Sequence, residues 1–257
     1  MARVLKNRFY YLTGKTTILL LLSVVFFFAP SEASAQRRFS KTYPASRNVR
    51  INLMNRSGTV TVEGWNRSEV QVQAYLETPA ATINPQLVDG TIFINMVKDN
   101  YGRGDVGSVN FTIRVPFNAM VDIETKIGNL NVSNVGGSLV RAKISSDGDI
   151  TLTNINAQFV VAENGIGNIF FDGEIRAGGG YRFTSMSGDI NLRVPFNSSF
   201  KLVATAPSTR SINLGSFAAG GDLKFVGDGR RVTGKVGDGS STLTVTNQRG
   251  SIAFIRR

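Results

Sequence analysis

The chain has 257 residues, with 29 Lys and Arg against 18 Asp and Glu, a formal net charge of +11, and neither His nor Cys. The missing residue types exclude disulfides, metal sites built on thiolate or imidazole, and catalysis by Ser-His-Asp, Cys-His or a histidine acid–base pair. Carboxylate catalysis remains, and it requires acidic groups that converge on a cleft. We therefore expect no metal, no cofactor and no enzymatic activity.

The first 35 residues have the pattern of a secretory signal peptide. Basic residues up to Lys15 precede an uncharged run from Ile18 to Ala29, and the segment 31–35 ends in small residues. The apolar run is shorter than the roughly 20 residues that span a bilayer. The pattern predicts cleavage after Ala35 and no transmembrane span after cleavage, with an uncleaved anchor as the alternative. The expected location is the periplasm, the outer surface or the extracellular space.

Residues 36–48 are predicted to be a polar lead-in, and short strands follow them. Apolar alternation indicates strands at 49–53, 58–62, 70–74 and 109–115, and a hairpin that turns at Asp89-Gly90. Residues 49–116 lack a regular period, although 57–62 has the form of a first coil. We interpret this part as antiparallel pairs that cap a larger structure. Trp65, the only tryptophan, is expected to be a lid over that end, with a sugar-stacking site as the alternative.

The middle of the chain is a repeat. A glycine followed by Asn or Asp opens four alternating strands, at Gly128, Gly148, Gly167 and Gly188, which lie 20, 19 and 21 residues apart. A period near 20 predicts a solenoid in which each repeat is one coil. The expected inward pairs after the glycines are Leu130/Val132, Ile150/Leu152, Ile169/Phe171 and Ile190/Leu192, and the strands before them are carried by Val121/Ile123, Val140/Ala142, Phe159/Val161 and Tyr181/Phe183.

The period loosens after residue 206. Strands are expected at 211–214 and 223–226, then a basic loop at 227–239 and a closing coil at 243–254. The candidate binding residues are Tyr101 and Arg103 in the glycine-rich segment 98–108, and Arg230, Arg231 and Lys235 in the basic loop. The basic loop suits phosphate or an acidic glycan, while a solvated turn is the simpler interpretation. Asp147-Gly148-Asp149 is interpreted as turn chemistry and not as a calcium site.

These observations predict an all-β chain whose architecture is a parallel β-helix or solenoid. The single domain 49–257 would comprise a cap at 49–116 with antiparallel pairs, regular coils of about 20 residues at 117–205, and irregular coils at 206–257. An antiparallel β-sandwich is the alternative, but it would not explain the regular glycines.

Several short motifs carry a family resemblance. They are Val115-Pro116, Ile127-Gly128-Asn129-Leu130, Asp147-Gly148-Asp149-Ile150, Ser187-Gly188-Asp189-Ile190 and Arg249-Gly250-Ser251-Ile252. In this pattern the chain resembles the bacterial candidate-adhesin domain family, a domain family of unknown function. The resemblance covers residues 49–254 and implies an extracytoplasmic β-solenoid, with no active site to carry over.

The expected function is that of a non-enzymatic envelope protein, an adhesin or an interaction scaffold. Outward rows of polar residues such as Asn131, Thr151 and Asn191 suit contact with a surface glycan or another envelope protein. No nucleic-acid partner is expected, because the protein is predicted to be exported and lacks interleaved aromatic and basic residues. A carbohydrate-active enzyme would need clustered carboxylates in a groove, and an envelope-stress or lipid-handling scaffold would need an apolar channel. The sequence leaves the oligomeric state open.

Overall fold

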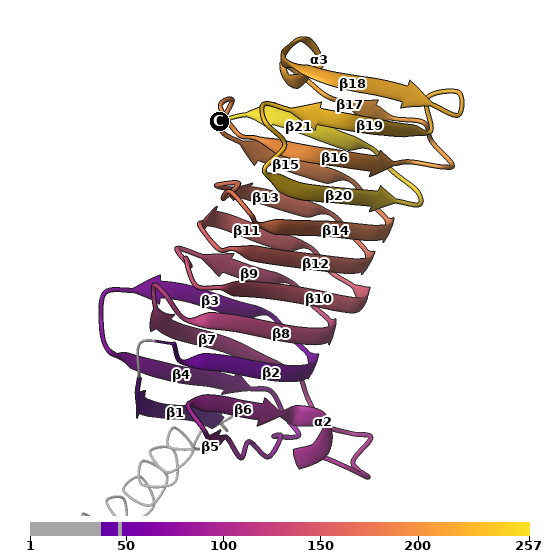
Figure 1. Ribbon diagram of the computed structural model, residues 1–257. Coiled ribbons are helices and arrows are strands. Elements are labelled where there is room, and N and C mark those ends of the chain that lie inside the picture. The colour runs from indigo at the N-terminus through magenta and orange to yellow at the C-terminus, as the bar shows by residue number, and fades with distance from the viewer. Residues whose placement is uncertain (1–36, 46–47) are drawn as a thin grey trace, which may run out of the picture. The chain divides into compact units, whose positions relative to one another are not determined.

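The computed structural model describes residues 37–45 and 48–257 of the chain (Figure 1). The predicted signal peptide, residues 1–35, lies outside the described residues. Residues 36–257 form one compact unit, in which every described strand belongs to one of two long sheets. In the described ranges, no helix combines the length and the apolar character that a bilayer crossing requires.

The two sheets alternate along the chain. Sheet A has the spatial order β1-β4-β7-β3-β9-β11-β13-β15-β21-β17, and sheet B has the order β18-β19-β16-β20-β14-β12-β10-β8-β2-β6-β5. The strands of sheet A are β1 (Arg37–Pro44), β3 (Val60–Trp65), β4 (Glu69–Leu76), β7 (Val109–Pro116), β9 (Leu130–Ser133), β11 (Ile150–Ile155), β13 (Ile169–Gly173), β15 (Ile190–Val194), β17 (Ile212–Asn213) and β21 (Ile252–Arg256). The strands of sheet B are β2 (Arg50–Ser57), β5 (Gln86–Val88), β6 (Thr91–Asn95), β8 (Met120–Ile127), β10 (Leu139–Asp147), β12 (Phe159–Ile166), β14 (Gly180–Ser187), β16 (Phe200–Thr205), β18 (Gly221–Val226), β19 (Arg231–Val236) and β20 (Ser241–Asn247). Two short helices, α2 (Met96–Asp99) and α3 (Phe217–Gly220), lie in connections.

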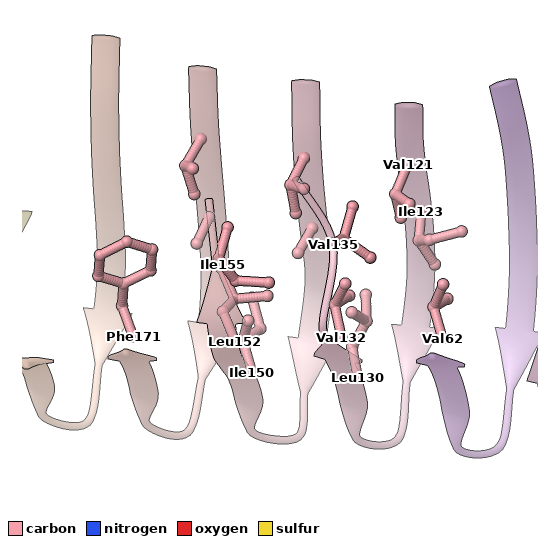
Figure 2. Close-up of a cluster of buried hydrophobic side chains, with 14 of the residues drawn as sticks. Val62, Val121, Ile123, Leu130, Val132, Val135, Ile150, Leu152, Ile155 and Phe171 are labelled. Carbon is pink, nitrogen blue, oxygen red and sulfur yellow. The ribbon is translucent and has the colours of Figure 1, made fainter. Parts of the chain in front are cut away.

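The predicted solenoid is confirmed. Each regular coil places one strand in sheet B, turns at its glycine, and places the next strand in sheet A. Parallel pairing aligns Leu130, Ile150, Ile169 and Ile190 in one row of sheet A, and all four are fully buried. Figure 2 shows this stacking of apolar side chains from successive coils. The alternation seen in the sequence therefore determines the core, because every second residue faces the opposite sheet.

In one strand the predicted register is wrong by one residue. Val160 and Ala162 of β12 are fully buried, since they align with Val140 and Ala142 of β10, while Phe159 is half-exposed. All four residues from Phe159 to Ala162 are apolar, so alternation along the strand does not distinguish its two faces. A slip of one residue reverses every side chain, and the register here is determined by the neighbouring coils.

Asn and Asp after the corner glycines form a ladder between coils. The side chain of Asn129 accepts the backbone N–H of Asp149 at 3.0 Å, and Asp149 accepts that of Asn168 at 2.6 Å. Asn168 continues the ladder to Asp189, which accepts the N–H of Ser251 at 2.7 Å. The glycines take the positive φ at these corners. The Asn and Asp residues instead satisfy backbone donors of the next coil, which agrees with turn chemistry as the role of Asp149.

The order of the coils in space differs from their order in the chain at both ends. The first coil, β2–β3, lies between β6–β7 and β8–β9, with parallel pairing on both sides. The last coil, β20–β21, likewise lies between β14–β15 and β16–β17. The first and the last coil are thus each inserted one coil inward, with β6–β7 covering the first coil and β16–β17 covering the last (Figure 1).

Two predictions about the irregular parts are wrong. Residues 37–44, expected in a polar lead-in, form β1, which pairs antiparallel with β4 and buries Tyr43. Residues 231–236, expected in a basic loop, form β19, which is hydrogen-bonded to β16 and β18. These two strands were missed because their outward residues are polar and β19 contains a glycine, so apolar alternation in them is weak. The predicted cap is confirmed in its antiparallel pairs, β1 with β4, β4 with β7 and β5 with β6, and it also contains the parallel coils β2–β3 and β6–β7.

Candidate binding surfaces

The interior between the sheets is filled by side chains. The inward residues of the regular coils are almost completely inaccessible, including the large rings of Phe171 and Phe183, whose centroids lie 5.0 Å apart. Shallow hollows open on the outer faces, one of about 270 Å³ over β1, β4 and β7 and one of about 210 Å³ beside Phe159 and Gly180. A ligand of this protein would therefore bind on an outer face and remain partly exposed.

The five predicted binding residues do not form one site. Tyr101, which is 90% exposed, and Arg103 follow α2 at the N-terminal end of the coils. Arg103 has structural contacts, since its guanidinium donates to the Ala80 carbonyl at 3.3 Å and its own carbonyl accepts from Arg56 at 2.7 Å. The other three residues lie at the opposite end, on the β18–β19 hairpin (Figure 1).

The hairpin brings two of its three predicted basic residues onto one face. Arg230 lies in the turn, and Arg231 and Lys235 lie four residues apart on β19, so both point to the same side of the sheet. Lys235 pairs across the strands with Lys201 and Asp222. All three predicted cations are exposed, and Lys201, which joins them only through strand pairing, was not predicted.

The outer face of sheet B carries an ion-pair cluster around Asp122. This carboxylate is only 6% exposed and contacts the guanidinium groups of Arg50 and, at 2.9 Å, Arg141, with the amide of Asn52 at 3.3 Å. Burial alone would lower the pKa of Arg141, but the hydrogen bond and the charge of Asp122 raise it above its ordinary value. The cluster holds three coils together and leaves Asp122 no free oxygen for catalysis.

We expect Asp122→Asn to lower the free energy of unfolding by about 2 kcal/mol, because it leaves two half-buried guanidinium groups without their anion. Urea denaturation followed by circular dichroism measures the change. Asp105→Asn is the control, because Asp105 is exposed and should change stability by less than about 0.5 kcal/mol. Equal stability of the two variants would show that the cluster contributes nothing.

The outer face of sheet A carries aromatic and polar side chains near its β1 end. Strand pairing aligns Arg38, Tyr75 and Asn110 in one row across β1, β4 and β7, and Ser40, Gln73 and Thr112 in the next. These six residues, with Phe39 and Ala74, line the hollow of about 270 Å³. The sequence did not identify this group, because its members come from three segments that lie far apart in the chain.

Trp65 lies on the same face and is not a lid over the end of the coils. Its strand, β3, has three strands of sheet A between it and the edge at that end. The indole Nε1 donates to the Glu69 carbonyl at 2.8 Å, and the guanidinium carbons of Arg67 and Arg114 lie 4.9 Å and 5.9 Å from the centre of the ring system. The prediction of a lid is therefore wrong, and Trp65 belongs to the outer polar surface.

The fold and these surfaces define a parallel β-solenoid with a packed interior and solvent-open polar faces. The chain belongs to the Toastrack DUF4097 family, whose model matches residues 31–254. This confirms the resemblance to candidate-adhesin domains of unknown function. A search of the curated proteins found no match.

Several solved structures are similar to this chain. A candidate cell adhesion protein from Clostridium sporogenes is 12% identical, with a TM-score of 0.52 over 86% of this chain and 100% of that one. A candidate adhesin from Bacteroides fragilis is also 12% identical, with a TM-score of 0.36 over 86% and 98% of the two chains. A candidate lipid binding protein from Parabacteroides distasonis is 10% identical, with a TM-score of 0.34 over 86% and 94%.

Proposed function

We propose that this protein is an exported, non-enzymatic envelope protein, an adhesin or an interaction scaffold that binds through the outer faces of its two sheets. The observation that carries the proposal is the contrast between a filled interior and shallow, solvent-open hollows on the outer faces. Family membership and the description of the Clostridium sporogenes protein as a candidate cell adhesion protein support it. The signal-peptide pattern of residues 1–35 supports export.

The structure offers less support for the two alternatives. Within the described ranges, no three His, Cys, Asp or Glu side chains group closely enough to hold a metal ion, and the buried carboxylates Asp122 and Asp172 are paired with arginines. A carbohydrate-active enzyme would need such carboxylates free in a groove. A lipid carrier would need an apolar channel, and the apolar side chains between the sheets pack against one another.

The proposal predicts binding of purified residues 36–257 to envelope polymers on a glycan array. If the basic hairpin takes part, the binding weakens at higher salt. Replacing Arg230, Arg231 and Lys235 together with Gln should then lower the affinity by about tenfold, since each exposed cation contributes up to about 1 kcal/mol.

The control loses the same charge at exposed cations outside the hollows, with Gln in place of Lys98, Arg176 and Arg249. It should bind like the unchanged protein. Absence of binding to every polymer and to every envelope protein tested by partner capture would contradict the proposed function.

A further inference from the structure

The hollow over β1, β4 and β7 is a small grid of side chains with hydrogen-bonding groups. Its two rows hold Arg38, Tyr75 and Asn110, then Ser40, Gln73 and Thr112. Neighbouring strands lie about 4.8 Å apart, and outward residues of one strand repeat every 6.7 Å or so. The grid is therefore about 10 Å wide, which suits a short segment of an oligosaccharide better than an ion or a whole protein domain.

Arg38 is the cation of this grid. Its guanidinium carbon lies 5.3 Å from the centre of the Tyr75 ring, and packing on an aromatic ring restrains an arginine while its N–H groups stay available. None of the eight residues that line the hollow is acidic, and no described carboxylate forms an ion pair with Arg38. A restrained guanidinium without an anion favours a ligand carboxylate, which it can bind through two parallel hydrogen bonds.

The other groups of the grid suit sugar hydroxyls. The side-chain oxygen of Asn110 accepts the backbone N–H of Thr59 at 2.8 Å, so its amide group is oriented with the N–H bonds left as donors. Ser40, Gln73 and Thr112 are exposed, and within the described residues their side chains have no hydrogen-bond partner in the protein. Together they offer both donors and acceptors, which hydroxyl groups require.

The same face continues along the strands toward Trp65. The row after Gln73 contains Gln71, whose side-chain oxygen accepts from Arg114 at 3.2 Å, and Arg114 also packs near the Trp65 ring. The Tyr75 row and the row of Glu69 lie six positions apart along β4, which is about 20 Å. The strip also carries Glu63 and Glu69 at its Trp65 end, and each carboxylate lies 3.4 Å from an arginine, Arg114 and Arg67 respectively. A strip of this length fits an extended chain better than a compact ligand.

From this geometry we propose that the strip from Tyr75 to Trp65 on sheet A binds an acidic polysaccharide, with Arg38 holding a sugar carboxylate and Ser40, Gln73, Asn110 and Thr112 binding hydroxyl groups. The inference rests on the proposed function and names the ligand class and the site for it. The site is distinct from the basic hairpin at the opposite end of the coils.

The test compares two probes that differ only in charge, an oligogalacturonate and the same oligosaccharide with its carboxylates methyl-esterified. Isothermal titration with residues 36–257 should show binding of the acid and at least about tenfold weaker binding of the ester, because the charged hydrogen bonds to Arg38 are lost. This comparison uses the unchanged protein and does not depend on a variant that folds.

Variants then locate the site. Arg38→Gln should reduce the affinity for the acid by about tenfold or more. The affinity of Arg38→Lys should lie between those of Arg38→Gln and the unchanged protein, since lysine keeps the charge but lacks the planar guanidinium group. Arg249→Gln removes the same charge at an exposed turn between β20 and β21 and should leave the affinity unchanged. Equal binding of acid and ester, or equal effects of Arg38→Gln and Arg249→Gln, would overturn this inference. If the array shows a ligand that Arg38→Gln still binds, the proposed function stands and this site fails.

Discussion

Gly167→Ala is expected to lower the free energy of unfolding by about 4 kcal/mol, because it combines backbone strain with a clash between coils. Gly167 has φ +124°, a conformation that L side chains rarely adopt. A Cβ built on it would lie 2.2 Å from the carbonyl oxygen of Gly148 and 2.9 Å from the side-chain oxygen of Asp149. Both contacts belong to the preceding coil, whose backbone is fixed by its own parallel pairing, so relief requires the coils to move apart.

Substitutions at two other glycines distinguish the cost of backbone strain from the cost of the clash between coils. Gly229 has φ +81° but no atom within 4 Å of a built Cβ, so Gly229→Ala should cost about 1 kcal/mol from strain alone. Gly104 has open space and no left-handed φ, so Gly104→Ala should be nearly neutral. Urea denaturation compares the free energies of unfolding of the three variants. A loss for Gly167→Ala no larger than that for Gly229→Ala would show that close approach of the coils is not what requires glycine.

The regular coils could be predicted because one constraint repeats at each corner. A glycine is needed where one coil meets the carbonyl of the coil before it, and the next residues alternate because one face is buried. Gly128, Gly148, Gly167 and Gly188 therefore predicted both the corner and the inward residues of the following strand. The prediction failed at β12, where four apolar residues in succession removed the alternation.

The ends and the polar strip could not be predicted, since they depend on which strands become neighbours. Arg38, Tyr75 and Asn110 come from three segments, and only the antiparallel pairing of β4 with β1 and β7 aligns them. Likewise, the final motif at Gly250 predicted one more coil, but nothing in its residues shows between which coils it lies. The local sequence pattern specifies that a segment forms a strand, whereas the packing of all the coils specifies the position of that strand in the sheet.

Deletion of residues 240–257 is expected to unfold the whole C-terminal end of the coils, and not only the deleted strands. This deletion removes β20 and β21, which pair with β14 and β15 on one side and with β16 and β17 on the other. Strand β17 pairs only with β21, and β16 would keep only β19 as a partner. In a solenoid whose coils follow chain order, loss of the last coil would expose one new end and leave the earlier coils intact.

Hydrogen exchange measures which strands lose protection when the last coil is deleted. In the truncated protein, the amides of β16, β18 and β19 should lose protection by at least about a hundredfold, because two or three strands alone are marginally stable in water, while β8 to β13 stay protected. Deletion of residues 36–45 is the control: it removes β1, an edge strand that pairs with β4 alone, and should expose only that edge. Full protection of β16 to β19 without the last coil would mean that the inserted coil does not hold this end. The expected loss follows from topology, since the segment that ends the chain occupies an internal position in both sheets.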